Sequence, residues 1–115
     1  MFPLLLSLTL ALLHPQVTVR PTVLFEGATA HVKCRIPRRE ENRSVRFGID
    51  GAQLSTRQVD AASGPITYDL WIEDIPCAVV SALCELTDSA DRVMADRRPM
   101  RVVCRGQELS DPDSF

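Results

Sequence analysis

Strict alternation of apolar and polar residues is the feature that most constrains what this sequence can fold into. In the clearest stretch the apolar set is Ile66, Tyr68, Leu70 and Ile72, and the set between them is Thr67, Asp69, Trp71 and Glu73. A period of two places successive side chains on opposite faces of a β-strand. We therefore predict a half-buried strand here, with Trp71 on its outward face.

The same alternation recurs along the chain and is interrupted by glycine, proline and aspartate. We expect strands over residues 17–20, 23–25, 30–36, 45–49, 66–72, 78–86 and 100–104, and an edge strand or loop over 53–59. The dipeptide Asp50–Gly51 is typical of a tight turn between two strands. Residues 92–99, which include Arg97, Arg98 and Pro99, are expected to face solvent as a bulged segment.

About seven short strands at this spacing predict an all-β fold, an antiparallel β-sandwich of two sheets packed face to face. No stretch after Leu13 has the period of a long amphipathic helix. Less than about a tenth of the domain is therefore expected to be helical.

The length and composition fit one globular domain. The chain has 115 residues, of which 45% are hydrophobic and 24% charged, and its formal net charge is -2. This length allows one hydrophobic core and is short for two. The composition excludes a disordered or collagen-like chain and gives no reason to expect a nucleic-acid partner.

The N-terminal segment is apolar but too short for an ordinary membrane-spanning helix. Phe2 to Leu13 is a run of 12 residues without a charge, whereas a spanning helix needs roughly 20. We predict a signal peptide or N-terminal anchor over 1–16, a β-sandwich domain over 17–105 and an acidic flexible tail over 106–115. A buried helix or strand at the start of the domain is the alternative for the apolar run. The expected location is secreted or on a cell or virion surface, with membrane contact only through an uncleaved N-terminal segment.

The order of these segments resembles immunoglobulin-like and fibronectin-type-III-like sandwich domains. The resemblance is carried by VTVRPTVLFEGATAHVKCRI, ENRSVRFGI, ITYDLWIEDIP, AVVSALCEL and a final RVV, which together cover about Val17 to Arg105. The chain is most similar to the small signal-bearing immunoglobulin-like proteins of bacteria and tailed phages. It departs from an antibody-type domain in two places. The strand that carries the tryptophan of antibody-type domains has Phe47 instead, and Trp71 lies on a later strand. The tyrosine that such domains have shortly before the second cysteine is absent before Cys84.

The cysteines predict two disulfides. An even number of cysteines behind an apparent export signal favours disulfides over free thiols. Cys34 and Cys84 lie on inward faces of their strands, fifty positions apart, where the resemblance implies the bond between the two sheets of an immunoglobulin domain. Cys77 and Cys104 are equidistant from a turn near 88–92, which would oppose them across a hairpin. Of the three pairings that four cysteines allow, we expect these two bonds together.

No catalytic, cofactor or metal site is expected. His31 is the only histidine in the domain, and its parity places it on an outward face beside Lys33 and Arg35, as is typical of a solvated surface histidine. The sequence has no Cys-x-x-Cys or His-x(3-5)-His spacing, no glycine-rich phosphate loop and no Ser-His-Asp set. We therefore expect no enzyme activity, no cofactor and no bound metal.

One polar loop carries candidate binding residues. Arg38, Arg39 and Arg43 would suit an anionic glycan or a phosphate. The alternative is a solvated loop in which Glu40 and Glu41 offset the positive charge.

Trp71 is the best single candidate for a contact residue, because an indole in a polar row is of the kind found in binding patches. The alternative is that the N-terminal strand or the tail covers it. We predict a non-enzymatic module for binding or adhesion, with a protein or surface glycan as partner. A disulfide- or thiol-dependent redox protein and a small structural accessory protein are the alternatives.

Overall fold

The computed structural model describes residues 14–79 and 81–105, and this part of the chain is all β. Its nine strands are β1 (Gln16–Arg20), β2 (Val23–Phe25), β3 (Ala30–Arg35), β4 (Asn42–Asp50), β5 (Gln53–Gln58), β6 (Thr67–Ile72), β7 (Ser81–Asp88), β8 (Val93–Pro99) and β9 (Arg101–Val103). None of the described residues forms a helix that is long and apolar enough to cross a membrane. The predicted signal or anchor over 1–16 lies outside the described residues apart from 14–16, as does the whole predicted tail over 106–115.

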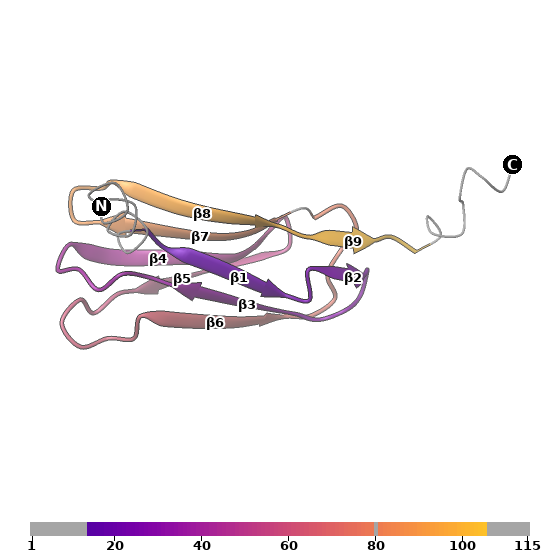
Figure 1. Ribbon diagram of the computed structural model, residues 1–115, viewed down its shortest axis with the longest axis horizontal. Coiled ribbons are helices and arrows are strands. Elements are labelled where there is room, and N and C mark those ends of the chain that lie inside the picture. Colours follow the sequence, from indigo (N-terminus) through magenta and orange to yellow (C-terminus); the bar gives the residue numbers. More distant parts are fainter. Residues whose placement is uncertain (1–13, 80, 106–115) are drawn as a thin grey trace, which may run out of the picture.

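The strands form two main sheets that pack face to face (Figure 1). One sheet has three strands in the order β1-β3-β6, and the other has four in the order β5-β4-β7-β8. Every pairing within these two sheets is antiparallel. The predicted antiparallel β-sandwich is confirmed. The segment 53–59, for which an edge strand or a loop was expected, contains the edge strand β5.

The core lies between the two sheets and follows the alternation of the sequence. On β3, Val32 and Cys34 are fully buried whereas Lys33 between them is exposed. Large buried residues come from both sheets and from their connections: Val17, Val32, Ile36, Val45, Phe47, Ile49, Ile72, Ile75 and Leu86. Burial of each such side chain is favourable by about 1.5 to 3 kcal/mol, so this layer is the main source of stability.

The hairpin between β4 and β5 depends on two glycines. Gly51 follows Asp50 in the predicted turn and has a φ of 92°. Gly48 has a φ of 147°, and a β-carbon there would collide with the backbone oxygen of Gln53 on the paired strand. Residues with a side chain are strained at both positions, so the local sequence selects this hairpin.

The C-terminal strands differ from the prediction. The expected bulged segment at 92–99 is in fact the regular strand β8, which pairs with β7 in continuous register from Thr87–Val93 to Ser81–Pro99. It lacks a clear apolar row because it is an edge strand on which most residues are exposed. The final strand β9 leaves this sheet and pairs in parallel with β2.

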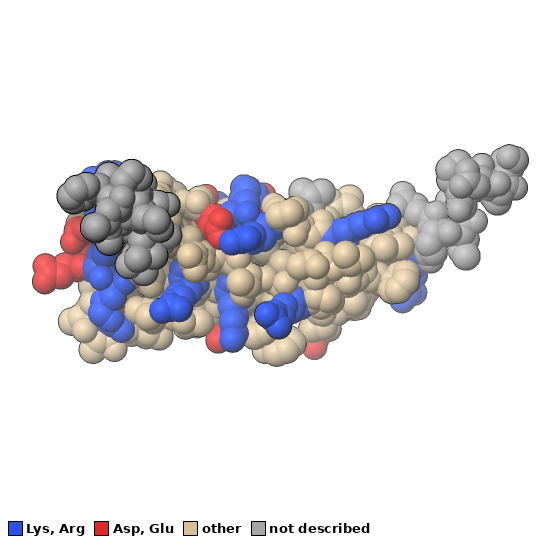
Figure 2. All heavy atoms as spheres, in the orientation of Figure 1, with Lys and Arg blue, Asp and Glu red and all other residues tan. Residues whose placement is uncertain are grey.

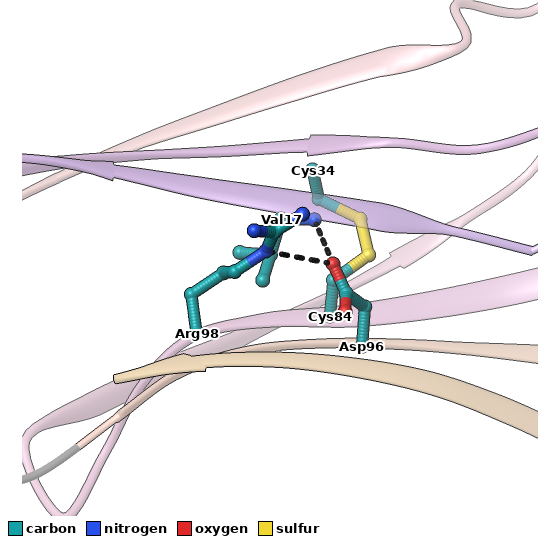
Figure 3. Close-up of a disulfide and its surroundings, with 5 residues drawn as sticks. All are labelled: Val17, Cys34, Cys84, Asp96 and Arg98. Carbon is teal, nitrogen blue, oxygen red and sulfur yellow. Dashed lines mark hydrogen bonds and ion pairs between the residues drawn. A yellow bond between two sulfur atoms is a disulfide. The ribbon is translucent and has the colours of Figure 1, made fainter. Parts of the chain in front are cut away.

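Cys34 and Cys84 join the two sheets through the core (Figure 3). Both are fully buried, and their Cα atoms lie 5.7 Å apart across the disulfide. Beside this bond, the backbone N–H of Val17 on β1 donates to Asp96 Oδ2 on β8 at 2.8 Å. Arg98 Nε lies 3.6 Å from the same oxygen. One carboxylate therefore links the edges of both sheets next to the covalent link.

The second disulfide has the expected partners but a different structural origin. Cys77 and Cys104 are bonded, with Cα atoms 5.2 Å apart. The sequence predicts the two cysteines on the paired strands of one hairpin, but Cys77 precedes β7 and Cys104 follows β9. The ladder between β7 and β8 begins at Ser81 opposite Pro99, so the bond joins the loop before β7 to the chain beyond β9.

Asp88 organises the turn between β7 and β8 from a buried position. Its Oδ1 accepts hydrogen bonds from the backbone N–H groups of Ala90 and Arg92, and its Oδ2 accepts one from Arg92 Nε, all at 2.9 Å. These bonds, the one from the Arg92 backbone N–H first among them in its effect, hold the pKa of Asp88 below its usual value.

Loss of the bond between the sheets should reduce stability strongly. We expect Cys34→Ala/Cys84→Ala to lower the free energy of unfolding by about 4 kcal/mol, because a loop of about fifty residues is no longer closed in the unfolded chain. Denaturant unfolding with Cys77–Cys104 kept oxidised measures this difference. A loss below about 1 kcal/mol would show that the link does not constrain the unfolded chain.

Asp88 should make the stability of the fold depend on pH in the acid range. Because its pKa is lowered in the folded protein, its contribution is present above the unfolded value near 4 and is lost as pH falls through the folded value. Asp88→Asn should therefore lower the thermal midpoint at neutral pH, and the gap to wild type should narrow on acidification. The exposed neighbour Asp91→Asn is the control. A gap that stays constant over the acid range would contradict this role.

Candidate functional site

The outer face of the three-stranded sheet gathers the residues that face away from the core on β1, β3 and β6. We call this set the three-strand face: Gln16, Thr18, Arg20, His31, Lys33, Arg35, Thr67, Asp69 and Trp71. The strand register arranges them in cross-strand rows. One row joins Arg20, His31 and Trp71, because Arg20 pairs with His31 and His31 with Trp71.

Trp71 and His31 form a stacked aromatic pair on this face. Their ring centroids are 4.1 Å apart and their planes differ by 6°. His31 is also fixed from a second side, since its Nε2 lies 2.7 Å from Asp69 Oδ1. Trp71 is nevertheless 65% exposed. The pair is thus an exposed aromatic surface whose orientation is set before any partner arrives, which lowers the entropic cost of binding.

A shallow depression of about 760 Å³ opens beside the aromatic pair. Its lining combines the indole and imidazole with a guanidinium and two hydroxyls, from Arg20, Pro21, Thr22, Thr29, His31 and Trp71. It lies where the chain leaves β1 and turns toward β2. The depression therefore offers an apolar ring, hydrogen-bond donors and a positive charge to one ligand.

The three-strand face also carries cations without acidic partners. Arg20, Lys33 and Arg35 are exposed, and none makes an ion pair with another described residue. Asp69 is opposite Lys33 in the register, but its carboxylate is directed to His31. In the view of Figure 2, basic side chains lie along the middle of the molecule, over the region that β1 and β3 occupy in Figure 1.

The outer face of the four-stranded sheet is different, because its arginines Arg46 and Arg97 are ion-paired. Arg46 Nη2 lies 2.6 Å from Glu85 Oε1 on the adjacent strand. Arg97 Nη1 lies 3.0 Å from Asp50 Oδ2 and donates to Ser81 Oγ at 3.0 Å. Cations that are already neutralised attract an anionic partner less, so the two faces of the sandwich are not equivalent.

The arginines predicted from the polar loop are placed separately and are engaged. Arg38 Nη2 donates to the carbonyl oxygen of Gly64 at 2.8 Å. Arg39 pairs with Glu41 at 2.5 Å, and Arg43 pairs with Asp91 at 3.0 Å. Each of the three arginines thus has a different partner, and a binding role for them stays a prediction.

Sequence reasoning placed Trp71 outward but missed the part that His31 plays. Parity alone shows that both side chains face out, and a histidine between basic residues is typical of a solvated position. Only the register between β3 and β6 shows that the two rings are neighbours. The residues are 40 positions apart, and no local pattern encodes that pairing.

The described residues show neither a free thiol nor a cluster that could hold a metal ion. All four cysteines are in disulfides. Within residues 14–79 and 81–105 no group of three or more His, Cys, Asp or Glu residues is placed to hold a metal ion.

Comparisons with known proteins support the fold. No family model matches the sequence, and a comparison with curated proteins finds no match. Among solved structures, the chain is similar to a superoxide reductase (neelaredoxin) from Ignicoccus hospitalis, with a TM-score of 0.61 and 10% identity over 78% of this chain and 80% of that one.

CHIR-AB1 is a second similar structure. The TM-score is 0.56 and the identity 14%, over 78% of this chain and 98% of that one. At these identities the likeness is one of fold. Together with the two-sheet topology and the disulfide between the sheets, it identifies the chain as an immunoglobulin-like antiparallel β-sandwich.

Proposed function

We propose that this protein is a non-enzymatic binding module, secreted or displayed on a cell or virion surface, that contacts a protein or glycan through the three-strand face. The observation that carries the proposal is Trp71, which is 65% exposed and yet held against His31. Large exposed aromatic side chains are frequent among the residues that dominate binding energy. The fold does not need an indole there, since Trp71 contributes nothing to the core between the sheets.

The two disulfides support an extracellular location. Such bonds persist in oxidising compartments and are rare in the cytosol. The same bonds argue against the thiol-dependent alternative, which needs a reactive thiolate, whereas each cysteine here has a partner. Titration of the purified, unreduced protein with a thiol reagent is expected to detect no free thiol.

Trp71→Ala should separate binding from stability. We expect binding to intact cells or to a glycan array to weaken roughly thirtyfold, because a tryptophan at the centre of an interface contributes about 2 kcal/mol or more. The thermal midpoint should stay nearly unchanged. Flow cytometry and array fluorescence with labelled protein measure the binding, and thermal unfolding measures the stability.

Phe25→Ala is the matched control, because Phe25 is an equally exposed aromatic residue, 61% accessible, on β2 outside the three-strand face. It should keep full binding. The proposal fails if Trp71→Ala binds as well as Phe25→Ala. It also fails if Trp71→Ala loses about 3 to 5 kcal/mol of stability, as a buried aromatic would.

A further inference from the structure

We infer that the ligand of the three-strand face is an anionic oligosaccharide, lying along β3 from the Trp71–His31 pair toward Arg35. The inference rests on the proposed function and names the chemical class of its ligand. It is carried by the line of cations on β3, by their lack of acidic partners and by the polar character of the rest of the face.

The cations form a line rather than a cluster. Lys33 and Arg35 are successive outward residues of β3 and His31 holds the outward position before them, so this outward row is roughly 13 Å long at 3.3 to 3.4 Å per residue. Arg20 adds a cation beside the start of this row, since it pairs with His31 across the sheet. A ligand that satisfies all of them must be extended and must carry negative charge at intervals along its length.

The positive charge on this line is available to a ligand. Arg20, Lys33 and Arg35 have no ion pair within the described part of the chain, whereas Arg46 and Arg97 on the four-stranded face are paired. Asp69 is the one acidic member of the three-strand face, and it is hydrogen-bonded to His31. A sulfate or carboxylate group therefore has free guanidinium and ammonium donors to bind, with little competition from the protein's own acids.

The composition of the face favours a sugar over a protein. Trp71 is its single large apolar side chain, and Gln16, Thr18 and Thr67 supply neutral hydrogen-bonding groups beside the cations. The centre of a protein interface is enriched in apolar and aromatic residues and depleted in lysine, and Lys33 lies in the middle row here. A sugar ring instead offers a C–H face to one indole and hydroxyl groups to the amide and hydroxyl side chains.

The test titrates the intact, oxidised protein with three probes of similar length. These are a sulfated hexasaccharide prepared from heparin, a carboxylated hexasaccharide prepared from hyaluronan, and hexaglutamate. Trp71 is the only tryptophan of the chain, so its fluorescence reports contact at the aromatic pair directly. We expect at least one of the oligosaccharides to bind, to change the Trp71 emission and to outcompete hexaglutamate.

Charge variants locate the binding. Lys33→Gln/Arg35→Gln should weaken oligosaccharide binding about tenfold or more and lower the slope of log Kd against log salt by about two, since each cation releases about one counterion. Arg46→Gln/Arg57→Gln removes the same formal charge from the four-stranded sheet, outside the three-strand face, and should leave the slope nearly unchanged. Trp71→Ala should weaken binding without changing the slope.

Three results would overturn the inference. The first is that both double variants lose the same affinity for the oligosaccharide, which would mean that only net charge matters. The second is that hexaglutamate binds as tightly as the oligosaccharides, which would identify an acidic protein as the partner. The third is that neither oligosaccharide binds at low salt. In the last two cases a loss of cell binding by Trp71→Ala would still support the proposed function, so the two failures are distinguishable.

Discussion

The disulfide between Cys34 and Cys84 determines which side of each central strand faces the core, and the candidate site follows from that choice. Once Cys34 points inward, the period of two directs His31, Lys33 and Arg35 outward. The antiparallel register then places Tyr68 opposite Cys34 and Trp71 opposite His31. A slip of one residue would bury Lys33 and Arg35 and expose the cysteine. The covalent bond in the core and the chemistry of the outer face are therefore two consequences of one register.

The sandwich distributes its charges unevenly, and this gives the molecule one face suited to an anion. Cross-strand ion pairs on the four-stranded sheet use neighbouring acids, as with Arg46 and Glu85. On the three-stranded sheet the one acid, Asp69, is used to hold His31. Exposed ion pairs add little to stability, typically under about 1 kcal/mol. The distribution of paired and unpaired cations therefore matters more for what approaches the surface than for how the chain folds.

Periodicity predicted most of the fold because the alternating apolar residues of a half-buried strand identify the side that faces the core. The outward position of Trp71 followed from the same rule. Edge strand β8 was missed because most of its residues are exposed and it has no apolar row to detect. The origin of the Cys77–Cys104 bond was missed because β9 pairs with β2, about eighty positions away, and local sequence does not specify such pairings. The Trp71–His31 stack was missed for the same reason: it depends on register between distant strands.

A fold shared at 10% identity with a superoxide reductase and at 14% identity with CHIR-AB1 does not by itself indicate an activity. What distinguishes this chain is what its strands present outward. The stack between Trp71 and His31 is worth about 0.5 to 1.5 kcal/mol, as aromatic pairs generally are, which is small beside the contribution of the buried layer. Leaving an indole 65% exposed gains the fold little. Stability therefore does not account for the orientation of the indole beside Arg20, Lys33 and Arg35, three cations that pair with no described acid, and this is the physical basis of the ligand we propose.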